Sequence, residues 1–397
     1  MKKLLIAGSA AMLSMSAFMT TAQAEVKVGV ILGFTGPIES LTPDMANSAE
    51  LAFKEASDSG ALLGGETITS VRADSTCTDS AAATAGAERL ITSDGVVAIM
   101  GADCSGVTTA ILTSVAVANG VAMISPSATS PALSTVEDKG LFFRTSPSDA
   151  RQGQVMADIL SDMGVKTVAI TYTNNDYGKG LSDAFTAAHE AAGGKIAIAV
   201  PHEDGKADYS AEVGTLSAVD ADMLAVLGYV DQGGAGIIQA AIDADAYDKF
   251  LLGDGMIGDS LVEKFGEDLS GAIGTVPGSE GAGADAFLAT AKAGGVDGDG
   301  PFRGESYDAA ALIVLAMQAA GSADKAGIAA NIMAVANAPG EKIMAGELGK
   351  ALKILADGGE VDYQGATGVE LIGPGEAAGS YKELSFAGGE QKTVRIR

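Results

Sequence analysis

The sequence predicts an α/β protein built from two lobes of one architecture. Short apolar runs alternate with amphipathic stretches, which is the pattern of parallel strands joined by helices that cover both faces of a sheet. The alternation begins with the apolar run 26–32 and starts again after Arg144, giving two successive sets of about five strands. The C-terminal tail holds both helical and strand-like segments, so we expect the chain to cross back between the lobes.

Hydrophobic periodicity assigns the elements of the first lobe. We expect strands at 26–32, 66–73, 96–100 and 121–124 and helices at 44–57, 80–92 and 105–119. The first helix carries its apolar residues on one stripe, at Met45, Ala49, Ala52, Phe53 and Ala56. Gly95 is a typical residue to end the second helix.

The same pattern continues through the second half of the chain. We expect helices at 149–163, 178–192, 209–218 and 234–244 and strands at 167–172, 195–200, 223–227 and 250–252. The segment 278–300 is rich in Gly, Ala and Asp and is expected to be surface. Further helices fit 305–320, 325–336 and 345–356, and late strands fit 381–386 and 393–396.

The N-terminus has the three parts of a secretory signal peptide. Lys2 and Lys3 form a positive region, an apolar run follows to about Met19, and Ala22-Gln23-Ala24 is an Ala-x-Ala cleavage site. We therefore expect residues 1–24 to be removed and the protein to be exported to the periplasm. The alternative is an N-terminal anchor helix, although the apolar run is too short for a good membrane span.

The charge balance excludes several classes of partner. The chain has a formal net charge of −26, and losing Lys2 and Lys3 makes it more negative still. No block of basic residues interrupts this charge, so we expect no binding to nucleic acid or anionic lipid. The spread of acidic residues favours a solvated surface over a store of cations.

Cysteine and histidine usage argues against metal binding and catalysis. Cys77 and Cys104 are the only cysteines, and an exported protein is expected to pair them in one disulfide, with two buried thiols as the alternative. The two histidines, His189 and His202, show no metal-ligand spacing. We expect no metal, no cofactor and no catalytic residue.

Two loops combine hydroxyl groups with the starts of helices. Residues 101–106 follow one buried strand, and residues 125–131 follow the next. Loops at the carboxyl ends of parallel strands present free N–H groups and the positive end of the helix dipole, an arrangement that binds carboxylates. Ser and Thr at helix starts also serve as plain caps, so the spacing alone leaves both interpretations open.

The chain resembles the periplasmic leucine/isoleucine/valine-binding proteins over essentially its whole mature length. The resemblance is carried by Lys27-Val28-Gly29-Val30, Thr35-Gly36-Pro37, Asp74, Cys77, Gly101 to Ser105, Ile124 to Pro131, Phe143-Arg144-Thr145, Asp176 to Gly180 and Asp208-Tyr209-Ser210. It implies two Rossmann-like lobes of the type I periplasmic binding protein, joined by three hinge crossings, with a ligand buried between them. It implies a lobe of residues 25–146 with 279–358 and a second of 147–278 with 359–397.

The resemblance also implies the binding residues. The carboxylate-binding positions match Ser105, Ser127, Ala128 and Thr129, and Ser127 and Ala128 would act mainly through backbone groups. The ligand-contacting tyrosines of the family match Tyr177 and Tyr229, and its ammonium-binding acid matches Asp254. The family's disulfide falls at Cys77 and Cys104. Asp176 and Asp231 are interpreted instead as caps or hinge-loop residues.

Two departures from the family pattern affect the ligand pocket. Asp254 stands where the leucine-type proteins usually carry Glu, so the acid is one methylene shorter. Leu41 stands near a position that is often aromatic. Both changes reshape the pocket for the ligand's side chain.

The resemblance implies a monomeric substrate-binding component of an ABC importer. Such a protein captures an amino acid, branched-chain or otherwise apolar, by lobe closure and docks on a permease in the inner membrane. The main alternative is a binding protein for a small carboxylate or amide that signals to a membrane receptor. An exported hydrolase is a third class, but no nucleophile beside a base is visible.

Overall fold

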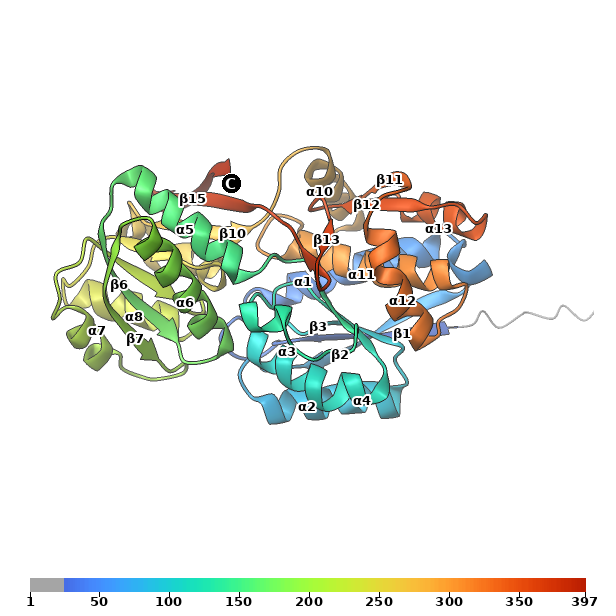
Figure 1. Cartoon of the computed structure of the whole chain (residues 1–397), viewed down its shortest axis with the longest axis horizontal. Coiled ribbons are helices and arrows are strands. Elements are labelled where there is room, and N and C mark those ends of the chain that lie inside the picture. Colours follow the sequence, from blue (N-terminus) through green and yellow to red (C-terminus); the bar gives the residue numbers. More distant parts are fainter. Residues whose placement is uncertain (1–24) are drawn as a thin grey trace, which may run out of the picture.

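The computed structural model describes residues 25–397, and the expected signal peptide lies outside them. Two lobes lie side by side, each with a central sheet covered by helices on both faces (Figure 1). No helix of residues 25–397 is both long and apolar enough to span a bilayer. The two-lobed α/β fold expected from the sequence is therefore confirmed.

The first lobe is built on a seven-stranded sheet. In spatial order its strands are β2 (Thr67–Asp74), β1 (Glu25–Leu32), β3 (Ala98–Gly101), β4 (Ala122–Ser125), β5 (Phe142–Arg144), β14 (Glu376–Ala377) and β13 (Leu371–Ile372). The five N-terminal strands pair in parallel, and most of their residues other than those of β2 are buried because helices cover both faces.

The second lobe repeats this plan. Its strands in spatial order are β7 (Lys195–His202), β6 (Thr167–Thr173), β8 (Met223–Leu227), β9 (Phe250–Leu252), β10 (Ile273–Pro277), β15 (Tyr381–Ala387) and β16 (Glu390–Ile396). The first five pair in parallel, and the last two are antiparallel additions at the edge.

The two sheets share one strand order. In each lobe the first strand lies between the second and the third, so the order reverses between β1 and β3 and again between β6 and β8. Ligands of open α/β sheets bind outside the carboxyl ends of the strands at such a reversal. The fold therefore places one candidate binding edge on each lobe.

Helices complete both lobes. In the first part of the chain these are α1 (Thr42–Asp58), α2 (Ser80–Arg89), α3 (Ser105–Ile111), α4 (Val117–Asn119), α5 (Asp149–Met163), α6 (Asp176–Ala191), α7 (Ser210–Leu216), α8 (Gly233–Asp243) and α9 (Asp259–Phe265). The later helices are α10 (Ala282–Gly294), α11 (Arg303–Ala320), α12 (Lys325–Ala336) and α13 (Leu348–Ala356), and they cover the first lobe together with the short pair β11 (Glu341–Met344) and β12 (Val361–Gly365). In α11 most residues are buried, which makes it the central helix of that layer.

Three short segments connect the lobes and bond to one another. The crossings run between β5 and α5, between β10 and α10, and between β14 and β15. The Ser380 hydroxyl donates to Gly278 O at 2.8 Å, and the Tyr381 hydroxyl donates to Ser148 O at 3.3 Å. These bonds join all three crossings into one hinge.

One expected boundary needs correction. Residue 359 is not where the chain returns to the second lobe, because β12, β13 and β14 pair within the first lobe and the crossing comes after Ala377. The segment 278–300 lies at the surface as expected, and it also contains the helix α10, of which only Phe287 and Ala291 are buried. The high content of Gly and Asp gave no helical signal in the sequence, and α10 buries only a narrow stripe of its surface.

The expected disulfide is present. Cys77 and Cys104 are bonded, with their Cα atoms 5.1 Å apart. Cys77 lies in the loop after β2, and Cys104 is the residue before α3. The bond therefore ties together two loops at the carboxyl edge of the first sheet.

Candidate functional site

A small cavity lies between the two binding edges. From the first lobe it is lined by Ile38, Leu41, Asp103, Cys104, Ser105, Ser127 and Phe302. From the second lobe it is lined by Tyr177, Tyr229, Asp254 and Gly255. The loops that follow β1, β3 and β4 thus face the loops that follow β6, β8 and β9. The cavity therefore lies where the reversal of strand order in each sheet predicts a ligand site.

The structure brings most of the predicted ligand residues together at this cavity. Ser105, Ser127, Tyr177, Tyr229 and Asp254 line it directly. Leu41 lines it too, as expected for the position that is often aromatic in the family.

Ala128 and Thr129 lie behind the cavity wall. The Ala128 N–H donates to the hydroxyl of Ser125 at 2.9 Å, and its carbonyl accepts from Arg144, so both backbone groups have protein partners. Thr129 is fully buried, and its hydroxyl makes no hydrogen bond of ordinary length in the described chain. It lies near the carboxylate of Asp149 and helps to lower the pKa of that group.

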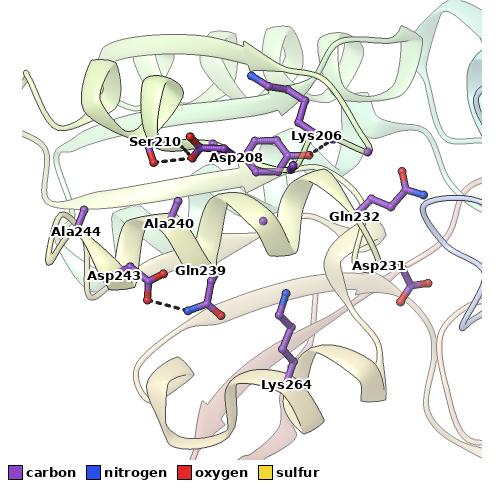
Figure 2. A pocket seen from close by; sticks show the side chains of 14 residues that line it. Lys206, Asp208, Ser210, Asp231, Gln232, Gln239, Ala240, Asp243, Ala244 and Lys264 are labelled. Carbon is purple, nitrogen blue, oxygen red and sulfur yellow. Dashed lines mark hydrogen bonds between the residues drawn. The ribbon is translucent and has the colours of Figure 1, made fainter.

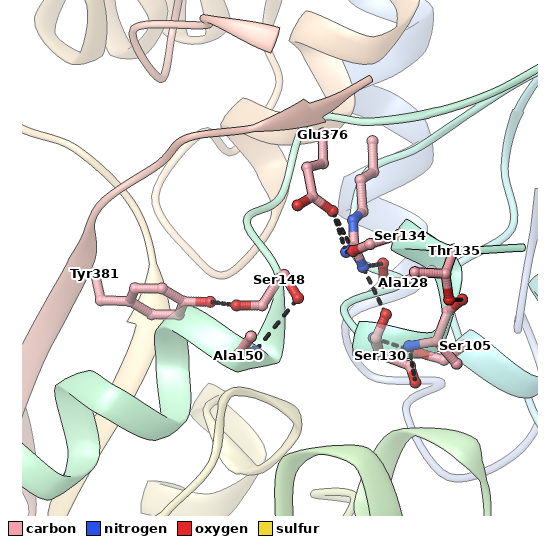
Figure 3. Close-up of polar contacts among 11 residues, drawn as sticks. Ser105, Ala128, Ser130, Ser134, Thr135, Ser148, Ala150, Glu376 and Tyr381 are labelled. Atoms are coloured by element: carbon pink, nitrogen blue, oxygen red, sulfur yellow. Dashed lines mark hydrogen bonds and ion pairs between the residues drawn. The ribbon is translucent and has the colours of Figure 1, made fainter. Parts of the chain in front are cut away.

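Ser105 begins α3 and links the two hydroxyl-rich loops. Its hydroxyl accepts a hydrogen bond from Ser130 N at 3.1 Å (Figure 3). The Ser127 hydroxyl donates to Asp103 O at 3.0 Å, which holds the second loop against the first. Ser105 therefore retains its own proton for a further acceptor, such as a carboxylate.

Arg144 fixes the loop that carries Thr129. Its guanidinium donates to the carbonyls of Ala128 and Ser130, each at 3.0 Å, and to the hydroxyl of Ser134 at 2.8 Å. It also forms an ion pair with Glu376 of β14 (Figure 3). A planar guanidinium suits this role because its donors point in fixed directions.

The second lobe contributes a pair of stacked tyrosines. The rings of Tyr177 and Tyr229 lie 5.2 Å apart at an interplanar angle of 20°. Asn175 caps α6 by accepting from the N–H groups of Tyr177 and Gly178, and its amide lies 3.4 Å from the Tyr229 hydroxyl. The cap therefore sets the direction of Tyr177 at the start of the helix.

Asp254 is a buried acid held by one of these tyrosines. The Tyr177 hydroxyl donates to Asp254 Oδ1 at 2.6 Å, and Gly255 N donates to the same tyrosine oxygen at 3.0 Å. Burial raises the pKa of Asp254 from 3.8 to about 6, although the bond from Tyr177 opposes the rise. Among residues 25–397, no cation of the protein forms an ion pair with this carboxylate at the cavity.

A second buried acid, Asp149, lies beside the site and was interpreted from the sequence only as a helix start. It is fully buried at the first position of α5, and neither carboxylate oxygen has a hydrogen-bond partner among the described residues. Burial, followed by the negative charge of Asp254, raises its pKa well above 3.8, whereas Arg144 and the Thr129 hydroxyl lower it. Asp149 is therefore close enough to Asp254 to respond to its charge.

Phe302 and Ile38 were also missed. Phe302 lines the cavity from the residue before α11, in a left-handed backbone conformation with φ of 60°. An aromatic residue in this region is strained, and such residues gather at functional sites. The pair Pro301-Phe302 gave no signal in the sequence, because only the fold brings it to the cleft.

Asp176 and Asp231 do not have the expected roles. Asp176 is an exposed first-turn residue of α6, where Asn175 is the cap. Asp231 bonds across the cleft to the first lobe, because its carboxylate accepts from Ser40 N at 2.8 Å. It is therefore a contact between lobes rather than a hinge or cap residue.

A larger and more open groove lies on the second lobe (Figure 2). It encloses about 660 Å³ between residues 205–210, α8 with the loop before it, and Lys264. None of the predicted ligand residues lines it. We place the candidate site at the smaller cavity, because the buried acid Asp254 and the hydroxyl-bearing residues Ser105 and Ser127 line it from opposite lobes.

Comparison with known proteins gives the family. Residues 25–351 match the sequence profile of the family described as periplasmic binding protein. The chain is 28% identical over 384 residues to the chemotactic signal transduction system substrate-binding protein BasB of Halobacterium salinarum, covering 93% of this chain and 89% of that protein.

Two solved structures have the same fold. A substrate-binding protein of a branched-chain amino acid transporter from Streptococcus pneumoniae, in complex with isoleucine, has a TM-score of 0.77 and 22% identity over 94% of this chain and 99% of its own. A solute-binding protein from R. palustris, in complex with 4-hydroxybenzoate, has a TM-score of 0.74 and 20% identity over 94% of this chain and 97% of its own. The chain therefore belongs to the periplasmic binding protein family and has the type I fold of its leucine/isoleucine/valine-binding members.

Proposed function

We propose that the protein captures a zwitterionic amino acid between its lobes for import by an ABC permease. The observation that carries this proposal is Asp254, a buried acid that lines the cavity and forms no ion pair within the described chain, with the buried carboxylate of Asp149 beside the cavity. Leaving such charges unpaired is costly, and a ligand ammonium would relieve the cost.

The opposite wall suits a carboxylate. Ser105 stands at a helix start, and its hydroxyl proton is free to be donated, while the buried hydroxyl of Thr129 makes no hydrogen bond of ordinary length among the described residues. Helix starts favour anions through their free N–H groups and dipole. A ligand with a carboxylate towards the first lobe and an ammonium towards the second would satisfy both walls.

Apolar side chains close the remaining part of the cavity. Ile38, Leu41 and Phe302 line it from the first lobe. A polar ligand side chain would lose its water there without gaining partners, so we propose an aliphatic or otherwise apolar amino acid.

The cellular context is proposed on the same basis. Residues 1–24 would direct export and be cleaved after Ala24, and the mature protein would act in the periplasm as a monomer that delivers its ligand to an inner-membrane permease. The relatives named above are substrate-binding or solute-binding proteins, in keeping with a role without catalysis.

A sensory role is the second candidate. The observation that favours it is the similarity to BasB, a substrate-binding protein of a chemotactic signal transduction system. The same pocket and closure would serve a receptor as well as a permease. Affinity purification of the ligand-loaded protein with solubilised membranes separates the two, since a permease or a receptor would be recovered.

A binding screen with matched pairs tests the ligand class. L-leucine is compared with 4-methylpentanoate and L-alanine with propionate, with benzoate as an aromatic carboxylate, by thermal shift and calorimetry. We expect an amino acid to bind at least about tenfold more tightly than its deaminated partner. Equal or tighter binding of the deaminated acids or benzoate would contradict the ammonium site.

Two variants test whether the preference for an amino acid over its deaminated partner comes from the cavity. Asp254→Asn is expected to abolish the preference for the amino acid. Asp308→Asn is the control, because Asp308 is also fully buried with its pKa raised to about 6 by burial, but it does not line the cavity. If both variants altered the preference alike, the effect would not come from the cleft.

A further inference from the structure

The lobes meet through a small set of hydrogen bonds beside the cavity. Asp231 follows β8 in the second lobe, and its carboxylate accepts from Ser40 N of the first lobe at 2.8 Å. Its own N–H donates to Pro37 O at 3.0 Å. The Ser260 hydroxyl donates to Asp231 Oδ1 at 3.0 Å and lies 3.3 Å from the Ser40 hydroxyl. We call Ser40, Asp231 and Ser260 the latch.

The latch is divided unequally between the lobes. Asp231 and Ser260 both belong to the second lobe, so their bond persists when the lobes separate. Only the two bonds from Asp231 to the first lobe, and the contact between the two serines, depend on closure. Ser260 therefore holds the Asp231 carboxylate ready for Ser40 in the open state.

The latch lies next to the cavity without lining it. Ser40 is exposed and Asp231 and Ser260 are partly exposed, whereas the cavity residues Leu41 and Tyr229 are buried. Leu41 directly follows Ser40, and Tyr229 is two residues before Asp231. Formation of the latch therefore positions one cavity residue from each lobe.

Glycines allow the close approach on which the latch depends. A Cβ at Gly258 of the second lobe would lie 3.0 Å from Leu41 Cδ2 of the first lobe. At a second interlobe contact, a Cβ at Gly180 would lie 2.9 Å from Pro131 Cδ and 3.0 Å from Ser130 Oγ. The lobes thus touch at two points through residues without side chains.

We propose that Asp231 is a positioning residue that holds the cleft closed and sets the rate of ligand release without contacting the ligand. The role in ligand release rests on the proposed function, whereas the closure contact itself does not. Breaking the bonds of Asp231 would favour the open form, which loses its ligand faster. Capture by the open form would proceed at an unchanged rate, because the latch forms only after the lobes meet.

Cross-linking tests the closure contact without any ligand. The natural cysteines are already bonded, so Ser40→Cys with Ser260→Cys introduces the only free thiols among residues 25–397. We expect a disulfide between positions 40 and 260 under mild oxidation, detected by non-reducing peptide mapping. The control pair is Ser40→Cys with Ser217→Cys, because Ser217 directly follows α7 on the second lobe and is exposed. If the first pair cross-linked no faster than the control, the latch would be refuted.

Kinetics test the role of Asp231. Asp231→Ala is compared with Asp231→Asn, which keeps one acceptor oxygen, and with Asp208→Ala, whose natural carboxylate bonds to Ser210 within its own lobe. The probes are L-leucine and L-alanine, followed by stopped-flow fluorescence of a dye on the cleft rim. We expect the alanine variant to release the bound probe about tenfold faster or more, the asparagine variant to be intermediate, and association rates to stay unchanged.

The outcomes separate the two proposals. If neither amino acid binds the natural protein, the proposed function fails, while the cross-link still decides whether the latch exists. If an amino acid binds and Asp231→Ala releases it at the natural rate, Asp231 does not hold the cleft closed. A loss of association rate in the Asp231 variants would equally overturn the proposal, because it would indicate a direct role in ligand capture.

Discussion

Replacing Asp254 by Asn should stabilise the unliganded protein while impairing ligand binding. Burial holds the pKa of Asp254 at about 6 in the folded chain, against 3.8 for the free side chain. At 1.36 kcal/mol per pKa unit, the charged form costs the folded state about 3 kcal/mol at neutral pH. This figure already includes the weaker bond that the Tyr177 hydroxyl makes to a neutral acceptor, because that bond is one of the causes that set the pKa, so the net gain is about 3 kcal/mol.

The sign of the pH dependence follows from the raised pKa. The cost is fully present above about pH 6, because the folded protein then holds a buried charge. It disappears as the pH falls through 6 towards 3.8, because the folded protein binds the proton more tightly than the unfolded chain. The advantage of Asp254→Asn over the natural protein should therefore shrink from about pH 7.5 to about pH 4.

Differential scanning calorimetry without ligand measures this effect. For a chain of this length, about 3 kcal/mol corresponds to a rise in Tm of about 4 °C near neutral pH. Asp308→Asn serves as a contrast, although burial raises the pKa of Asp308 to about 6 as well. Each Asp308 oxygen accepts from a backbone N–H, of Ala366 or of Thr367, so the NH2 group of an amide would face another donor and the variant should lose stability. The reasoning is refuted if Asp254→Asn melts at or below the natural protein near neutral pH, or if its advantage persists in acid.

Three further predictions concern the cleft and its support. The double variant Ser105→Ala with Thr129→Val should bind the amino acid at least about tenfold more weakly in calorimetry, and unchanged affinity would remove both residues from the carboxylate site. Thiol titration of the denatured, unreduced protein should find no free thiol at Cys77 or Cys104, and reduction should cost about 3–4 kcal/mol in urea unfolding, since the bond closes a loop spanning a sequence separation of 27. Gly180→Val should keep the lobes apart, detected as a larger radius of gyration in X-ray scattering with saturating amino acid; a scattering curve equal to that of the natural protein would show that closure tolerates the side chain.

The fold was accessible from the sequence because its signals are local. Composition and period identify a buried strand such as β8 and an amphipathic helix such as α5. The strand β8 runs from Met223 to Leu227 and the helix α5 from Asp149 to Met163, as expected. The carboxyl ends of parallel strands then indicate where ligands bind, which drew attention to the loop that holds Ser105. Asp254 was proposed only from the resemblance to the leucine/isoleucine/valine-binding proteins.

What the sequence did not reveal depends on contacts between distant segments. Asp149 has the local pattern of an ordinary helix start, and only the burial of its unpartnered oxygens marks it as a candidate for the ammonium site. Phe302 reaches the cavity through the return of the chain to the first lobe. Asp231 bonds to Ser40, which is 191 residues away in the sequence, so no local pattern could pair them.

The shared strand order of the two sheets has a consequence for the direction in which a ligand lies. The two walls of the cleft are equivalent edges of the same scaffold, turned to face one another. The backbone scaffold alone therefore gives a bound molecule no preferred orientation between the two lobes. In the proposed function, direction would come from a few side chains on corresponding loops, hydroxyl groups after β3 and β4 and phenols with an acid after β6, β8 and β9. Exchanging those side chains between the walls would reverse the electrostatic polarity of the cleft while leaving both sheets, the hinge and the helices as they are.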